Sequence, residues 1–274
     1  MCSSDLNEDD VQGYSGTPVN VNGLTFEYQF DNQATGLEFP HEGRYFVAVD
    51  SRADPFTDQS LAGPYRLHFW QNDVTPPRMK FLTTHVSAGR PALAAIVKDK
   101  GAGVDPLSLV VGYRGVLLLA AFYDPSSGLA VWLLDGAPKI PVGKTAAIAV
   151  GSDYQESKNV DQAGANILPN TAFKRLRLRA VARPVVNWLL PSRSACVAKR
   201  ESLIVSAGSP RRVRNVAFYD GRHKLSTDRA GFFGLYSAVW RAGKAAHGRH
   251  VLRAVVTDRM GAHAQARRLV RVCH

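Results

Sequence analysis

The sequence predicts an all-β protein made of tandem antiparallel β-sandwiches, preceded by part of a further β-sandwich. Apolar residues recur in short runs rich in Val, Leu, Ala, Phe and Tyr, and Gly, Pro, Asp or Ser closes each run. Helical periodicity is nearly absent. The longest apolar run, residues 116–122, has the length of a strand and falls far short of the about 20 residues that span a bilayer. We therefore expect a folded chain without a membrane span.

The distribution of charge divides the chain into three parts. Residues 1–72 hold 3 basic and 11 acidic residues (net −8), residues 73–182 hold 13 and 8 (net +5), and residues 183–274 hold 18 and 4 (net +14). Separate folding units account for such a gradient. We expect a partial β-sandwich in residues 7–72, a complete one in residues 73–182 and a complete, basic one in residues 183–274.

Alternation of apolar and polar residues locates the strands of each part. In the first part they are expected at residues 24–30, 44–49 and 65–70, and paired prolines at positions 76 and 77 then stiffen a linker. The strands expected in the middle part are residues 80–84, 92–98, 108–113, 116–123, 129–134, 145–151 and 173–181. Those expected in the last part are residues 186–190, 202–207, 213–219, 224–227, 234–240, 250–257 and 264–272, with Asp220-Gly221 as a hairpin turn. Short strands with turns about every ten residues predict a β-sandwich.

Two segments repeat one another and support a tandem arrangement. Residues 147–153 and 252–258 each combine an alternating strand with a final Asp that can cap the following turn. Basic residues alternate with apolar ones in residues 174–179 and 267–272, which predicts solvated strand faces with Arg guarding the sheet edges. The alternative is a site for a polyanion such as cell-wall polymer, nucleic acid or anionic lipid. We favour solvated faces and expect no nucleic-acid partner.

The cysteines predict one disulfide. The chain has 3 Cys, and no pair has the spacing of metal ligands. Cys196 and Cys273 lie near the two ends of the basic part, and the first and last strands of an antiparallel sandwich can lie side by side. A disulfide here would stabilise the fold by about 4–5 kcal/mol in the chain-entropy model and implies an oxidising, extracytoplasmic compartment. The alternative is two unpaired buried thiols.

The first six residues have a pattern of their own. Residues 1–6, MCSSDL, match the translation of a sequencing adapter in which GTG is read as the start codon. We expect them to be an artefact and the natural chain to begin upstream, which would account for the missing basic and apolar regions of a signal peptide. The alternative is a genuine short N-terminus with a lipidated Cys2, although no hydrophobic stretch precedes that residue.

Several motifs resemble those of known families. Residues 43–50, GRYFVAVD, followed by GPYRL at residues 63–67, resemble the closing strands of the bacterial pre-peptidase C-terminal domain, a β-sandwich appended to secreted peptidases. The middle part is similar to a bacterial immunoglobulin-like repeat through DVTPP, DKGAGVD and SDYQ at residues 73–77, 99–105 and 152–155. The last part is similar to the same repeat through SPRRV and GRHVLRAVV at residues 209–213 and 248–256.

These resemblances imply a parent protein and a role. Such arrays occur at the C-termini of secreted actinobacterial subtilisin-like serine peptidases, so the resemblance implies an extracellular fragment, secreted or cell-wall associated, with a catalytic domain upstream. It implies a non-catalytic accessory region that serves as a spacer, attachment or substrate-contact module. The alternative is a carbohydrate- or cell-wall-binding or adhesion module whose partner is a cell-wall polymer or polysaccharide.

The sequence does not carry the chemistry of a peptidase. His247-Gly248-Arg249-His250 matches the histidine motif of a subtilase by letters, but no Gly-Thr-Ser turn or Asp-Ser/Thr-Gly strand accompanies it. A histidine without a nucleophile cannot perform acyl transfer. We therefore predict a turn before a strand at this motif, and a chain that is not an enzyme.

Two further groups are candidate binding residues. Asp99 and Asp105 flank a Gly-rich loop and could hold Ca²⁺ if Asp124 or Asp153 supplied a third carboxylate. We favour capping carboxylates in a hairpin, and therefore predict no metal and no cofactor. Residues 154–170 form a long polar loop, read either as a contact surface or as a solvated crossover.

Aromatic residues offer a possible sugar platform, because a ring can stack on a sugar while the sugar hydroxyls stay in water. Phe232 and Phe233, in a Gly-flanked turn, are the candidate ligand contacts. The other aromatic side chains considered are expected to point into the sandwich core: Trp132, Tyr219, Tyr236 and Trp240.

Overall fold

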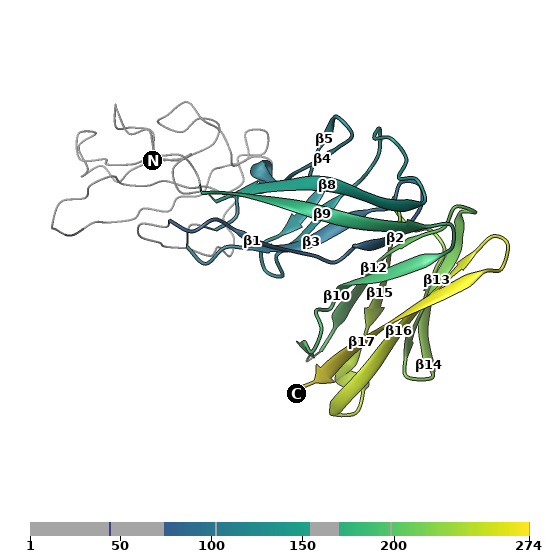
Figure 1. Ribbon diagram of the computed structural model, residues 1–274. Helices are drawn as coiled ribbons and strands as arrows, with labels where there is room; N and C mark the ends of the chain where they lie inside the picture. Colours follow the sequence, from purple (N-terminus) through teal and green to yellow (C-terminus); the bar gives the residue numbers. More distant parts are fainter. Residues whose placement is uncertain (1–43, 45–73, 102, 154–169, 198, 274) are drawn as a thin grey trace, which may run out of the picture. The chain divides into compact units, whose positions relative to one another are not determined.

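The structure is a computed structural model that describes residue 44 and residues 74–101, 103–153, 170–197 and 199–273 (Figure 1). Cys2, the strands expected within residues 7–72 and nearly all of the loop at residues 154–170 lie outside the described residues. Contacts divide the chain into two compact units, and one of them, Pro77–Lys98 with Val104–Ser152 and Thr171–His274, holds every strand named below.

The first sandwich consists of two β-sheets with a common apolar core. One sheet has the order β1-β3-β7-β6, in which β1 is Arg78–Phe81, β3 Leu93–Lys98, β7 Leu129–Trp132 and β6 Phe122–Asp124. The other has the order β2-β9-β8-β4-β5, in which β2 is His85–Ser87, β9 Thr171–Val181, β8 Gly143–Ser152, β4 Val110–Tyr113 and β5 Val116–Leu119. Both sheets contribute side chains to the core, among them Val97, Trp132, Val111, Ala149 and Leu176.

The second sandwich repeats this arrangement. Its smaller sheet has the order β10-β12-β15, in which β10 is Val185–Leu190, β12 Glu201–Gly208 and β15 Leu235–Trp240. Its five-stranded sheet has the order β11-β17-β16-β13-β14, in which β11 is Cys196–Val197, β17 His263–Val272, β16 Gly248–Asp258, β13 Val213–Asp220 and β14 His223–Asp228. The core between the two sheets includes Trp188, Leu203, Phe218, Leu252 and Val270.

The two five-stranded sheets share one topology. In each, a short edge strand lies parallel to the last strand of the sandwich, β2 beside β9 and β11 beside β17. The last strand forms a long antiparallel pair with the strand before it, β8 with β9 and β16 with β17 (Figure 1). The predicted all-β class, with two successive β-sandwiches, is therefore confirmed.

Strand alternation decides which side chains enter the core, because successive residues point to opposite faces of a sheet. In β9, Leu176, Leu178 and Ala180 are buried, whereas Arg175, Arg177 and Arg179 are exposed. The solvated basic faces expected from the sequence are therefore present on this strand.

Three details of the strand prediction are wrong. The strand expected at residues 116–123 is two strands, β5 and β6, which belong to different sheets. The backbone N–H of Ala120 donates to Leu109 (2.8 Å) and that of Ala121 to Val131 (2.8 Å), so the chain changes sheet between neighbouring small residues. The edge strands β2 and β11 were not predicted, because with three and two residues they are too short to show alternation. Ser108, where a strand was expected to start, is the last residue of a 3₁₀ turn, Pro106–Ser108, and the strand begins at Val110.

A third apolar cluster covers the outer sides of the two smaller sheets within the same compact unit. It contains Ala94 and Val131, which point away from the first core, together with Leu189. Ser206 Oγ donates a hydrogen bond of 3.0 Å to the carbonyl oxygen of Ala92 at this cluster. The outer faces of the two five-stranded sheets are not part of this cluster and are the ones considered below.

Candidate functional site

The predicted disulfide is present and anchors one edge of the second sandwich. Cys196 and Cys273 are bonded, with their Cα atoms 5.7 Å apart. Beside the disulfide, the N–H of Arg271 donates to the Ala195 carbonyl (2.8 Å), and that of Cys273 donates to Val197 (2.9 Å). The two-residue strand β11 is thereby held against the end of β17.

The outer face of the β16–β17 pair carries arginines directly opposite one another. Arg249 pairs with Arg271 and Arg253 with Arg267, and between these two pairs Val251 lies opposite Leu269. Residues opposite each other in an antiparallel pair share one face of the sheet. Lys224 joins the same face through its register with Tyr219, which in turn lies opposite Arg253. We call this surface the arginine face and define it by Lys224, Arg249, Val251, Arg253, Arg267, Leu269 and Arg271.

Tyr219 belongs to this face and not to the core, so its predicted position is wrong. The guanidinium carbon of Arg253 lies 4.4 Å from the centroid of the Tyr219 ring, within the range of a cation–π contact. The other three aromatic residues expected in the core, Trp132, Tyr236 and Trp240, are buried as predicted.

The acidic residues of the second sandwich lie away from the arginine face, and three of the four accept hydrogen bonds there. The carboxylate of Asp258 is buried and accepts hydrogen bonds from Ser209 Oγ (3.0 Å) and from two backbone N–H groups of the β16–β17 turn. Asp228 accepts from the N–H groups of Ala230 and Ser237, each at 2.9 Å. Glu201 begins β12 in the other sheet, where burial raises the pKa of its carboxyl.

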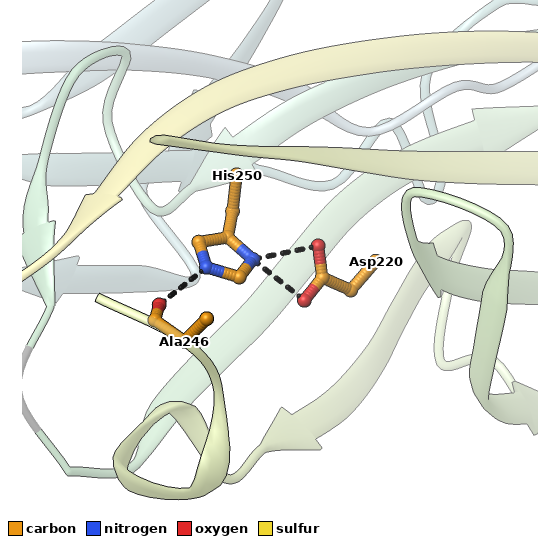
Figure 2. A network of polar contacts seen from close by, with 3 residues as sticks. All are labelled: Asp220, Ala246 and His250. Carbon is orange, nitrogen blue, oxygen red and sulfur yellow. Dashed lines mark hydrogen bonds and ion pairs between the residues drawn. The ribbon is translucent and has the colours of Figure 1, made fainter. Parts of the chain in front are cut away.

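The fourth acidic residue, Asp220, binds His250 at the end of the β13–β14 hairpin. Figure 2 shows His250 Nδ1 facing both carboxylate oxygens, at 3.0 and 2.8 Å, while Nε2 lies 2.7 Å from the carbonyl oxygen of Ala246. Both side chains are largely buried, and the His250 ring packs 5.5 Å from the ring of Trp240. Both ring nitrogens of His250 therefore face oxygen atoms, one of the Asp220 carboxylate and the other of the backbone.

The subtilase-like letters at residues 247–250 lie at the start of β16. The last three of them lie within β16, so the predicted turn covers only His247. His250 has an acidic partner, which the sequence did not suggest, but its second nitrogen meets a backbone carbonyl and not the hydroxyl of a nucleophile. The pair therefore clamps the hairpin to the segment before β16.

Among the described residues, the cations of the arginine face have no ion-pair partner. The Nε of Arg253 is buried and has no hydrogen-bond partner among the residues that the structure describes. A neighbouring arginine, Arg268, instead points to the opposite side and donates to the Trp188 carbonyl (2.8 Å), and its burial lowers its pKa. The face thus holds a surplus of positive charge.

Phe232 and Phe233 form an exposed aromatic pair in the β14–β15 loop. Their rings are in edge-to-face contact, with centroids 4.6 Å apart and planes at 85°, and their side chains are 66% and 49% exposed. Reciprocal backbone hydrogen bonds between Phe232 and Leu235 close the turn, and Gly234 takes a φ of +86° that suits glycine. The loop therefore presents the two rings to solvent.

The outer face of the first five-stranded sheet is unusually apolar, which was not predicted. Four large side chains are exposed here, Leu117 (77%), Leu119 (63%), Ile148 (54%) and Phe173 (73%). The registers of β5, β4, β8 and β9 put them in two adjacent rows on one face, with Val110, Gly112 and Val150 between them. We call Leu117, Leu119, Ile148 and Phe173 the apolar face; Arg175 lies directly opposite Ile148 at its border.

The candidate calcium ligands are engaged in local hydrogen bonds. Asp99 Oδ2 accepts from the N–H groups of Gly101 (2.7 Å) and Gly103 (3.1 Å), and Asp105 Oδ1 accepts from Leu107 (3.0 Å). Asp153 accepts from the backbone and side-chain amides of Asn170, at 3.0 and 2.7 Å. Within the part of the chain that the structure describes, no three His, Cys, Asp or Glu side chains are grouped to hold a metal ion.

Asp124, the other carboxylate considered for calcium, closes the β6–β7 turn. Its oxygens accept hydrogen bonds from the side chains and backbone of Ser126 and Ser127. Burial alone would raise the pKa of Asp124, but these hydrogen bonds outweigh it and hold the pKa below its ordinary value.

One pocket of about 470 Å³ is lined by residues 87–91, 139–141 and 207–210. Its lining contains Arg90, Lys139 and two serines but no His, Cys, Asp or Glu, so it lacks a base beside a nucleophile.

Among the described residues, no helix is both long and apolar enough to cross a membrane.

Comparison with known proteins finds no matching family and no matching curated protein. Among solved structures, the chain is similar to the fibronectin(III)-like modules of Clostridium thermocellum CbhA, at 24% identity and a TM-score of 0.29 over 32% of this chain and 94% of that one. Dimeric latent PorU from Porphyromonas gingivalis matches at 17% identity and a TM-score of 0.44, over 73% of this chain and 20% of PorU. The glucan-utilization protein SGBP-B of Bacteroides ovatus, in complex with a mixed-linkage heptasaccharide, matches at 9% identity and a TM-score of 0.30, over 74% of this chain and 47% of that one.

Proposed function

We propose that this chain is a non-catalytic accessory region of an extracellular multidomain protein, acting as a spacer and as an attachment or substrate-contact module. The resemblance of residues 43–50 and 63–67 to the pre-peptidase C-terminal domain supports a subtilisin-like serine peptidase as the parent. The Cys196–Cys273 disulfide supports an oxidising compartment. We also propose immunoglobulin-like domains at residues 73–182 and 183–274 after a partial sandwich at residues 7–72, and the two separate apolar cores support this division.

The apolar face is the observation that carries the contact role. Contiguous exposed apolar side chains on a soluble protein mark an interaction surface. Each such side chain stabilises a contact by on the order of 1.5–3 kcal/mol when it is fully buried. Because Arg175, Arg177 and Arg179 continue from its border along β9, a complementary partner has an apolar surface with acidic residues at one edge. The proposed partner is the catalytic domain of the same parent chain.

The parentage is tested by the DNA upstream of the Asn7 codon. An open reading frame that encodes the Asp, His and Ser of a subtilase is the expected result, and a reading frame without them contradicts a peptidase parent.

The non-catalytic role is tested by incubating the purified chain with casein. No hydrolysis is expected, and hydrolysis by the purified chain would contradict the proposal.

The contact role is tested by binding of the parent's catalytic domain to the chain. L117S/I148S removes two side chains of the apolar face and is expected to weaken binding by about tenfold or more. V239S/M260S is the matched control, since Val239 (61%) and Met260 (71%) are exposed apolar residues of the second sandwich. An equal loss in both variants would show that the apolar face is not the contact.

The exposed aromatic pair supports a second candidate function, carbohydrate or cell-wall binding. Stacking of a sugar on Phe232 or Phe233 buries apolar surface and is insensitive to salt. Pull-down with insoluble cell wall and polysaccharide tests it, with F232S/F233S expected to abolish binding. Phe173→Ser, which removes an exposed Phe of the first sandwich, is the control and should bind normally.

A further inference from the structure

We propose that the arginine face binds an acidic glycan, a linear polysaccharide that carries phosphate or carboxylate groups. The anionic groups would contact the arginine pairs. The apolar faces of the sugars would contact the strip formed by Val251 and Leu269, which lies between these pairs. The inference rests on the proposed attachment role and names the partner of that role.

The first argument is the repulsion within the face. Side chains directly opposite in an antiparallel pair have Cβ atoms about 4.5–5.5 Å apart, and like charges there destabilise the sheet. Two such pairs occur in succession, Arg249 with Arg271 and Arg253 with Arg267. Asp220, Asp228 and Asp258 bond to other groups and Glu201 lies in the other sheet, so within the described residues no carboxylate forms an ion pair with these arginines. A bound polyanion would supply the missing negative charge.

The second argument is the chemistry of the cations. Guanidinium groups bind carboxylate and phosphate with two parallel hydrogen bonds, which a row of ammonium groups cannot reproduce. The Tyr219 ring holds the Arg253 guanidinium in place, with the guanidinium carbon 4.4 Å from the ring centroid. Part of the cost of ordering this side chain is therefore met before a ligand arrives.

The third argument is the apolar strip, which distinguishes a glycan from a nucleic acid. The two arginine pairs are four residues apart along the strands, about 13 Å. Val251 (44% exposed) and Leu269 (37%) fill the space between them. Double-stranded DNA presents a continuous line of closely spaced phosphates, so charged groups would face the apolar strip as well as the arginine pairs. A sugar ring has apolar C–H faces, so a glycan that spaces its charges along the chain matches both parts of the surface.

The experiment titrates the full chain with four probes. A linear polymer of glycosyl phosphates and polygalacturonate carry the two proposed anions and show which of them is preferred, whereas double-stranded DNA and a neutral glucan are the comparisons. Binding to at least one acidic glycan is expected to be tighter than to DNA. If about four cations contact the polymer, affinity should fall about 50-fold as salt rises from about 50 to about 200 mM.

Variants locate the binding. R253Q/R267Q removes one arginine pair and is expected to weaken acidic-glycan binding by about tenfold or more. R177Q/R179Q makes the same change of charge on the exposed face of β9 and should change affinity by less than about twofold. V251S/L269S keeps every charge and should weaken glycan binding but not DNA binding. Thermal unfolding and near-UV circular dichroism confirm that each variant is folded.

Several outcomes would overturn the inference. Equal losses in R253Q/R267Q and R177Q/R179Q would mean that net charge alone attracts the polymer. DNA binding as tight as glycan binding, unaffected in V251S/L269S, would mean that the face accepts any polyanion. Binding of neutral glucan through Phe232 and Phe233, without binding of either acidic glycan, would overturn the inference and leave the attachment role standing.

Discussion

The five-stranded sheets of the two sandwiches have the same topology and differ in what their outer faces carry. β8 and β16 both begin at a glycine with φ near +120°, Gly143 and Gly248, and run for ten and eleven residues. Counted from these glycines, Ile148 of the apolar face and Arg253 of the arginine face occupy the same position. Inward residues hold the shared topology in both sandwiches, so outward positions are free to differ.

The largest expected difference between the sandwiches is covalent. β11 is bonded to the end of β17 by Cys196–Cys273, whereas β2 lies beside β9 without a disulfide. Because the two cysteines are 77 positions apart in the sequence, C196S/C273S should lower the free energy of unfolding of the second sandwich by about 4 kcal/mol. Urea unfolding followed by Trp188 and Trp240 fluorescence measures it, and Cys2→Ser is the control. Intact mass should rise by two hydrogens on reduction, and an unchanged mass would contradict the disulfide.

The second difference concerns the residue two positions after the glycine that begins β16 or β8. His250 bonds Asp220 and Ala246, whereas the corresponding Thr145 makes no side-chain hydrogen bond within the described residues. His250→Ala should lower the free energy of unfolding by about 1–3 kcal/mol, the range for hydrogen bonds to charged groups. Thr145→Ala should change it by less than about 0.5 kcal/mol. Thermal unfolding of both variants tests this contrast, which similar losses would contradict.

The first sandwich has a pH-dependent turn of its own. The hydrogen bonds from Ser126 and Ser127 hold the pKa of Asp124 below its ordinary value, so ionised Asp124 stabilises the fold above that ordinary value. This contribution is lost as pH falls through the lowered pKa. Asp124→Asn should therefore lower the free energy of unfolding by less than about 1 kcal/mol at neutral pH. The difference from the wild-type chain should shrink below about pH 4, and urea unfolding at several pH values measures it.

The smallest expected effect is an increase in the free energy of unfolding, whereas the substitutions above lower it. Replacing Arg249 by Thr removes its repulsion from Arg271 and puts a β-branched residue on the strand. The free energy of unfolding should rise by about 0.3–0.5 kcal/mol. Ile148→Arg makes the converse change in the first sandwich, opposite Arg175, and should lower stability by a similar amount. Denaturation curves that moved in the other direction would show that the arginine pairs do not repel.

Alternation along the chain was sufficient to predict the long strands and their buried sides. Leu176, Leu178 and Ala180 of β9 are buried because every second residue of a strand faces the same way. The disulfide could be predicted from the position of two cysteines near the ends of one sandwich. The short strands β2 and β11 and the change of sheet at Ala120 could not, because pairing partners distant in sequence determine them.

Local pattern therefore defines the all-β class and the inward face of each strand, since period-two alternation is a property of a single segment. Sheet register decides which outward side chains lie next to one another on a surface. Leu117, Ile148 and Phe173 are far apart in the sequence, and only the pairing of β5, β4, β8 and β9 makes them one surface. In the same way, the pairing of β16 with β17 sets arginine against arginine, and the fold directs the carboxylates of the second sandwich elsewhere. Side chains that share a surface are selected by hydrogen bonds between strands, which no single stretch of sequence contains.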